Sequence, residues 1–111
     1  MTVSYHDIVR ASGLLEDIVA KTPLVKSLTL SSICQAEVYL KLENQQYTAS
    51  FKERGAYVKL ASLTPEERDK GVIAVSAGNH AQGVAYNAKR LGIPATIVMP
   101  KNTPYTKVHH T

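Results

Sequence analysis

Apolar side chains recur at helical spacing in the first part of the chain. The residues that predict a helix over about residues 4–19 are Ile8, Val9, Ala11, Leu15, Ile18 and Val19. Ser4 followed by Asp7 has the spacing of a capping box with an acidic residue in its third position. Gly13 lies inside the pattern, where it can divide the helix in two. Thr22 precedes a proline and so avoids helical backbone angles, which predicts that the helix has ended there.

Strand and helix patterns alternate through the rest of the chain. Residues 37–43 alternate polar and apolar side chains, which predicts a strand. Residues 72–75 are a short apolar run typical of a strand covered on both faces, and 95–99 form another apolar strand. The expected helices are 52–63, 65–70 and 79–91. This alternation predicts an α/β fold with a parallel sheet and right-handed crossovers. Residues 101–111 show no regular pattern.

Composition and charge exclude several classes of function. The 111 residues are 44% hydrophobic and 20% charged, as in ordinary globular proteins, and no apolar run is long enough to span a bilayer. The first seven residues lack the pattern of a secretory signal, so a cytoplasmic protein with no membrane partner is expected. The net charge is +4, but basic and acidic residues interleave, so no nucleic-acid partner is expected. Cys34 is the only cysteine, which excludes an internal disulfide, and it is expected to be a small buried side chain.

Two polar loops that open helices carry the residues best suited to chemistry. Residues 49–56 include Lys52, and residues 76–83 include a serine, an asparagine and a histidine. Free backbone N–H groups at helix starts hold anions, and a lysine placed there can bind a carbonyl cofactor covalently. Each residue also has an ordinary structural interpretation: Lys52 as a surface lysine, Asn79 as a helix cap and His80 as a structural histidine.

The two loops resemble motifs of the serine/threonine dehydratases that depend on pyridoxal phosphate (PLP), and above all those of the threonine dehydratases, or threonine ammonia-lyases. The matching runs are Ser50-Phe51-Lys52-Glu53-Arg54-Gly55 and Ser76-Ala77-Gly78-Asn79-His80-Ala81-Gln82-Gly83. The resemblance implies the parallel-sheet, three-layer α/β architecture of the tryptophan-synthase-β-like PLP enzymes, incomplete here because those enzymes are much longer. It implies that residues 1–50 supply an N-terminal helix and first strand to the larger domain, and that residues 51–111 form part of the smaller one. The second half of the enzyme is absent, and full-length relatives are expected to be homo-oligomers.

The resemblance also implies roles for single residues. Lys52 is expected to hold PLP covalently and to act as the base that removes the substrate α-proton, with Phe51 beside the cofactor ring. Asn79 is expected to hydrogen-bond the cofactor's 3-hydroxyl. The residues expected to hold the carboxylate of an amino-acid substrate are Ser76, Gly78, Asn79 and His80. A lysine base must be neutral, which a nearby positive charge favours, and Arg54 either supplies that charge or pairs with a carboxylate.

Ala77 bears on the choice of reaction. Related serine racemases have a serine at this position as a second acid/base group, and alanine cannot donate a proton, so the resemblance favours elimination over racemisation. The implied reaction converts L-threonine to 2-oxobutanoate and ammonia, in isoleucine biosynthesis or threonine catabolism. Serine dehydration and serine racemisation are the alternatives within the family. A chain without the loop that binds the PLP phosphate is expected to be inactive alone, and the alternative outside catalysis is a folded remnant that binds a partner.

Two smaller expectations complete the prediction. Ala49 stands where the family usually has glycine, and if the position requires positive φ, alanine is strained there by about 1 kcal/mol or more. The adjacent His109 and His110 are too few to form a metal site, so no metal is expected.

Overall fold

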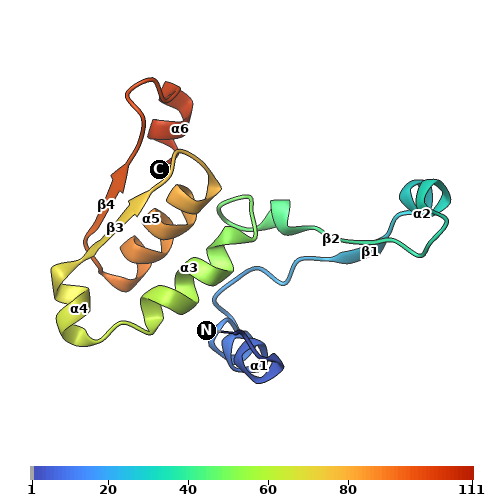
Figure 1. Ribbon diagram of the computed structural model, residues 1–111, viewed down its shortest axis with the longest axis horizontal. Coiled ribbons are helices and arrows are strands. Elements are labelled where there is room, and N and C mark those ends of the chain that lie inside the picture. The colour runs from blue at the N-terminus through green and yellow to red at the C-terminus, as the bar shows by residue number, and fades with distance from the viewer. Residues whose placement is uncertain (1) are drawn as a thin grey trace.

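The structure, a computed structural model, describes residues 2–111 as helices and strands that alternate along the chain (Figure 1). The helices are α1 (Tyr5–Leu14), α2 (Leu28–Cys34), α3 (Lys52–Ala61), α4 (Pro65–Lys70), α5 (Asn79–Leu91) and α6 (Tyr105–His109), with a 3-10 helix η1 (Glu43–Gln45). The strands are β1 (Leu24–Lys26), β2 (Tyr39–Lys41), β3 (Val72–Val75) and β4 (Ala95–Val98). Within the described residues, every helix falls short of the length and apolar character that a membrane span requires.

The strands form two separate sheets of two strands each. β3 and β4 pair in parallel, with Val72 opposite Ala95, which confirms the predicted parallel sheet. β2 lies within the predicted strand 37–43, but it pairs antiparallel with β1, which the sequence pattern did not predict. β1 has three residues and all of them are exposed, so it carries too little hydrophobic alternation to be recognised.

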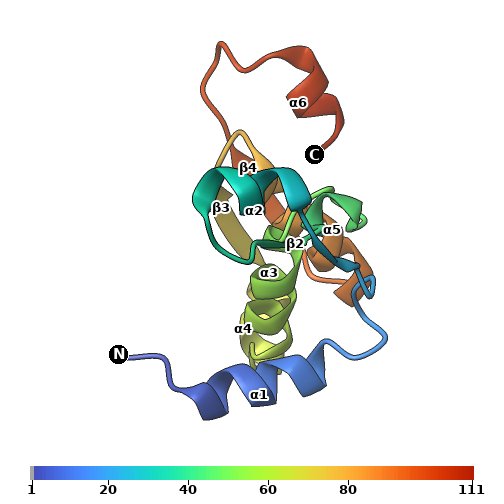
Figure 2. The same cartoon turned by 90° about the vertical axis from the view of Figure 1, so that its right-hand side faces the viewer.

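The core lies where α5 meets α3 on one side and the parallel sheet on the other (Figure 1). One buried cluster joins Ala56 of α3, Ala74 of β3 and Val84 of α5. A second cluster, made by Leu60, Ala88 and Ile93, continues the same contact. The β1–β2 pair and α2 extend away from this core (Figure 1), and in the view along this extension α2 lies in front of the core (Figure 2). The predicted helices 52–63 and 79–91 therefore form the part of the chain that carries the two polar loops.

Side-chain caps fix where two of the helices begin. The Ser4 N–H donates to an oxygen of Asp7 at 2.9 Å, and Ser4 Oγ accepts from the Asp7 N–H, which confirms the predicted capping box of α1. Thr64 and Glu67 form the same arrangement at the start of α4. α1 ends at Leu14 rather than near Val19, and the chain continues as turns in which Asp17 has a φ of 59°. α6 forms in a segment whose sequence showed no regular pattern.

The structure corrects two expectations about burial. β3 is covered on one face only, because Ala74 is buried while Ile73 and Val75 are each 76% exposed. Cys34 is exposed rather than buried, because α2 projects from the core and buries none of its residues. The chain exposes 8059 Å², whereas a folded monomer of this mass exposes about 6,000 Å². The uncovered face of β3 and the projecting β1–β2 pair account for this larger accessible area.

Gly71, between α4 and β3, is expected to tolerate no side chain. Its φ is +77°, and a Cβ there would lie 2.6 Å from the Pro94 carbonyl oxygen. Gly71→Ala is therefore expected to lower the free energy of unfolding by about 2 kcal/mol or more, measured by urea unfolding. Gly55 in α3 has an ordinary φ and open space where a methyl group would lie, so Gly55→Ala is the matched control and should raise stability by roughly 0.5–1 kcal/mol. Equal effects of the two substitutions would contradict this account.

Candidate functional site

Lys52 is the first residue of α3, and its side chain lies beside an aromatic ring. Phe51 occupies the N-cap position without a side-chain cap, and the Lys52 N–H donates to Ser50 Oγ at 3.3 Å. Lys52 Nζ lies 5.2 Å from the centroid of the Phe51 ring. The side chains of Phe51 and Lys52 are exposed, whereas Ser50 is buried. The buried serine holds the turn against the protein, and the Lys52 amine and the Phe51 ring lie on its outer side.

A cavity of about 600 Å³ collects residues from α3, β3 and α5. Three of the sequence-predicted site residues line it, namely Phe51, Lys52 and His80. Its apolar walls are Gly55, Ala56, Leu60, Val72, Ile73, Ala74, Val75 and Val84, and Lys59 is the second amine. Lys52 and Phe51 thus face a common cavity with His80 from the first turn of α5.

The rest of the second loop lies beside this cavity rather than on its lining. Gly78 is the N-cap residue of α5 and provides no side-chain cap, so Asn79 is the first helical residue and not the cap. Ser76 Oγ accepts a hydrogen bond from the Gly78 N–H at 3.2 Å. Asn79 is exposed. The first-turn N–H groups of α5 therefore lack a side-chain cap and are suited to an anion such as a carboxylate.

A glycine brings the two loop-bearing helices together. A Cβ on Gly83 of α5 would lie 3.2 Å from the backbone carbonyl of Lys52 and 3.3 Å from the Glu53 nitrogen. A side chain at this position would be tighter than most Cβ contacts, so the glycine favours this close approach of α5 to the start of α3. Gly83 therefore sets the distance between the lysine and the helix that carries His80.

Sequence reasoning missed three buried polar residues beneath the lysine turn. Glu53 and Asn87 are fully buried and Thr48 nearly so. Asn87 lies on the same face of α5 as Val84 and Ala88, and an amide on an apolar helix face was a signal that could have identified it. Glu53 gave no such signal, because a glutamate in the first turn of a helix is usually solvated.

Arg54 supplies no free positive charge beside the lysine. Its Nε and Nη2 donate to the two carboxylate oxygens of Glu43 at 2.7 and 2.8 Å. The hydrogen bonds from Arg54, which outweigh desolvation, lower the pKa of Glu43 to about 2, and Glu43 in turn raises the pKa of Arg54. Of the two roles expected for Arg54, the structure shows the pairing with a carboxylate.

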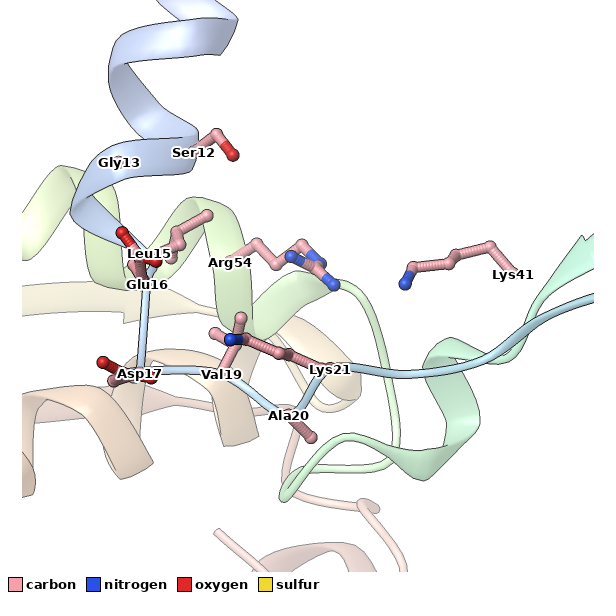
Figure 3. A pocket seen from close by; sticks show the side chains of 10 residues that line it. All are labelled: Ser12, Gly13, Leu15, Glu16, Asp17, Val19, Ala20, Lys21, Lys41 and Arg54. Carbon is pink, nitrogen blue, oxygen red and sulfur yellow. The ribbon is translucent and has the colours of Figure 1, made fainter.

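A second cavity of about 350 Å³ lies near the end of α1 and does not contain Lys52 (Figure 3). Three cationic side chains line it, from Lys21, Lys41 and Arg54, and Figure 3 shows the last two turned toward each other. Arg54 is already paired with Glu43, and Lys41 Nζ donates to the Thr22 carbonyl. Two of the three cations are thus engaged, and the acidic Glu16 and Asp17 also line this cavity, so it is a poor match for a phosphate. The cavity at Lys52 is the better candidate site.

Comparison with known proteins identifies the family. Residues 15–111 match the family described as "Pyridoxal-phosphate dependent enzyme". The chain belongs to this family. A catabolic L-threonine dehydratase, TdcB, from Staphylococcus aureus is 54% identical over 110 residues, which are 98% of this chain and 32% of the relative.

Solved structures agree with this assignment. Maize serine racemase matches 99% of this chain and 33% of its own, with a TM-score of 0.89 and 35% identity. The processed form of threonine deaminase isoform 2 from Solanum lycopersicum matches 97% of this chain and 33% of its own, with a TM-score of 0.80 and 39% identity. The chain thus spans about a third of the length of these relatives. The expected fold class, the parallel-sheet α/β architecture of these PLP enzymes in incomplete form, is confirmed.

The cavity at Lys52 fits the cofactor of the family. PLP needs an amine to bind its carbonyl carbon and space for an aromatic ring, and the cavity offers Lys52, an adjacent Phe51 and apolar walls. Its volume of about 600 Å³ is within the range of roughly 300–1,000 Å³ typical of small-molecule sites.

Ala49, in the turn before Lys52, is strained as expected from the sequence, since its φ is 54°. Ala49→Gly is expected to raise the free energy of unfolding by roughly 0.5–1 kcal/mol, because relief of the left-handed conformation exceeds the added freedom of the unfolded chain. Urea unfolding measures the change. Ala61 in α3 has no such strain, so Ala61→Gly should lower stability instead. A destabilised Ala49→Gly variant would contradict the strain.

The Glu43–Arg54 pair predicts a loss of stability in acid. The folded-state pKa of Glu43, about 2, lies below its ordinary value of 4.5. The stabilisation is therefore fully present above about pH 4.5 and is lost as the pH falls toward 2. Unfolding free energies measured between pH 6 and pH 2 should fall less steeply for Glu43→Gln than for the natural chain.

Glu16→Gln is the control for this pH dependence. Glu16 is exposed and forms no ion pair within residues 2–111. Its replacement should leave the slope unchanged. A Glu43→Gln variant with the same slope as the natural chain would show that the pair contributes little.

Proposed function

We propose that this chain is the N-terminal part of a PLP-dependent ammonia-lyase that converts L-threonine to 2-oxobutanoate and ammonia. The observation that carries the proposal is the common cavity shared by Lys52, Phe51 and His80. The 54% identity to a catabolic L-threonine dehydratase supports threonine as substrate and breakdown as the context, with isoleucine biosynthesis as the other context. The chain spans about a third of the relatives' length, and we expect these 111 residues to be inactive alone.

In this proposal Lys52 holds PLP covalently and Phe51 lies against the cofactor. PLP, when bound, supplies an electron sink for the charge that develops at the substrate α-carbon. The Lys52 amine, once the substrate amine has displaced it, would remove the α-proton, and the β-hydroxyl would leave as water. A second water is consumed in releasing ammonia and 2-oxobutanoate, so the atoms balance.

The loop after β3 holds the substrate and cofactor in this proposal. The uncapped first turn of α5 supports carboxylate binding by the segment from Ser76 to His80, which includes Gly78. Asn79 is exposed, as hydrogen bonding to the cofactor's 3-hydroxyl requires. Residues 1–50 belong to the larger domain of the enzyme, and residues 51–111 to the smaller one. The separation of the β1–β2 sheet from the β3–β4 sheet supports this division.

Ala77 favours elimination over racemisation. Racemisation needs an acid/base group on each face of the α-carbon, whereas elimination needs only Lys52 on one face. Methyl side chains have no proton to donate. The structural likeness to maize serine racemase therefore does not decide the reaction, and serine racemisation is the less favoured one within the family.

One observation favours a second candidate function, a non-catalytic chain that binds a partner protein. Ile73 and Val75 expose an apolar strand face that nothing within residues 2–111 covers. Such faces are typical of interaction surfaces. The labelling experiment below separates the two candidates, because a binding fragment needs no reactive amine at Lys52.

The experiment is reductive trapping of PLP on the purified chain. After incubation with PLP and reduction with borohydride, peptide mass spectrometry should find the adduct at Lys52. Lys52→Arg should abolish the adduct, and Lys59→Arg, a change on the same cavity wall, should leave it intact. The S. aureus relative is the positive control. Labelling of that relative without an adduct at Lys52 here would overturn the proposed function.

A further inference from the structure

A buried polar cluster lies directly beneath the turn that carries Lys52. The turn is residues 48–52, here called the lysine turn, and the cluster is Thr48, Glu53 and Asn87. Glu53 Oε2 accepts from the Thr48 N–H at 2.8 Å and from Thr48 Oγ1 at 3.0 Å. The Glu53 carboxylate therefore connects the two ends of the lysine turn, because it bonds Thr48, the first residue of the turn.

The same cluster ties the lysine turn to α5. Asn87 Nδ2 donates to the Glu53 carbonyl at 3.0 Å and to the Gly83 carbonyl at 2.9 Å. Gly83 is the residue whose backbone approaches the Lys52 carbonyl. The backbone of Lys52 is thus fixed by two sets of contacts, namely the Thr48–Glu53 hydrogen bonds and the packing of α5.

Stability alone does not account for a carboxylate in this position. A buried charged group is costly, and apolar side chains of similar volume usually stabilise a core as well or better. Glu53 Oε1 and Asn87 Oδ1 also have no hydrogen-bond partner within residues 2–111, which adds to the cost. What the cluster provides instead is one fixed conformation of a turn that includes the strained Ala49.

We infer that Glu53 is a positioning residue that fixes the Lys52 amine beside the Phe51 ring at the mouth of the cavity, with Thr48 as its partner. Glu53 does not line the cavity, so its function in catalysis rests on the proposed role of Lys52. Its geometric effect does not need the cofactor. The Lys52–Phe51 contact at 5.2 Å is present in the chain itself and reports the position of the amine.

Two variants of Thr48 test the inference. Thr48→Val keeps the shape but removes the hydroxyl donor to Glu53, and Thr48→Ser keeps the donor. Gly71→Ala is the control for lost stability, because it disturbs the chain at the contact with Pro94 rather than in the lysine turn. The first readout, free of cofactor, is the ring-current shift of the Lys52 side-chain protons by Phe51, measured by NMR on the folded fraction. The second is the yield of the borohydride-reduced PLP adduct at Lys52 relative to Lys59.

Thr48→Val is expected to remove most of the ring-current shift and to lower the Lys52-to-Lys59 labelling ratio by about tenfold, the effect of one lost hydrogen bond to a charged group. Thr48→Ser and Gly71→Ala should keep both readouts. A full ring-current shift in Thr48→Val, or an equal loss in Gly71→Ala, would overturn the positioning role. If the natural chain shows the ring-current shift but forms no PLP adduct at Lys52, the proposed function is wrong. The positioning role of Glu53 is then tested by the ring-current shift in the Thr48 variants alone.

Discussion

The approach of α5 to the first turn of α3 is the contact on which the rest of the site depends. Gly83 lets the helix backbone come against the carbonyl of Lys52, and Asn87 bonds the two helices one turn later. The contact places the lysine turn and the loop after β3 on one cavity. It also organises the core, since Ala56 and Val84 meet at the same interface. Small side chains are what allow this close packing.

The sequence predicted the repeating features of the fold well. The amphipathic helices around Lys52 and after Ser76, the apolar strands β3 and β4 and the capping box at Ser4 each have a local signal. The β1–β2 pair had no local signal, because the three residues of β1 are all exposed and show no alternation of apolar and polar side chains. Pairing between distant segments also depends on tertiary contacts. Likewise, no local signal could show that Glu53 is buried, since its burial depends on α5 packing over the start of α3.

The candidate site is predictable from the sequence in part, for a physical reason. Lys52 and His80 lie in the first turns of α3 and α5, both of which the sequence predicts as helices. The packing of α5 against α3 then brings the two residues onto one cavity. The pairing of Arg54 with Glu43 could not be foreseen, because it joins α3 to a segment outside the parallel sheet. That pairing neutralises the cation next to Lys52.

The contact between the two helices can be measured directly in solution. A Cβ built on Gly83 would lie 3.3 Å from the Glu53 nitrogen, so the α-protons of Gly83 lie near the Glu53 amide proton. A nuclear Overhauser spectrum of the folded chain should show a strong cross-peak between them. Absence of that cross-peak in a chain whose α3 and α5 helices are both formed would contradict the shared cavity and the placement of Lys52 within it.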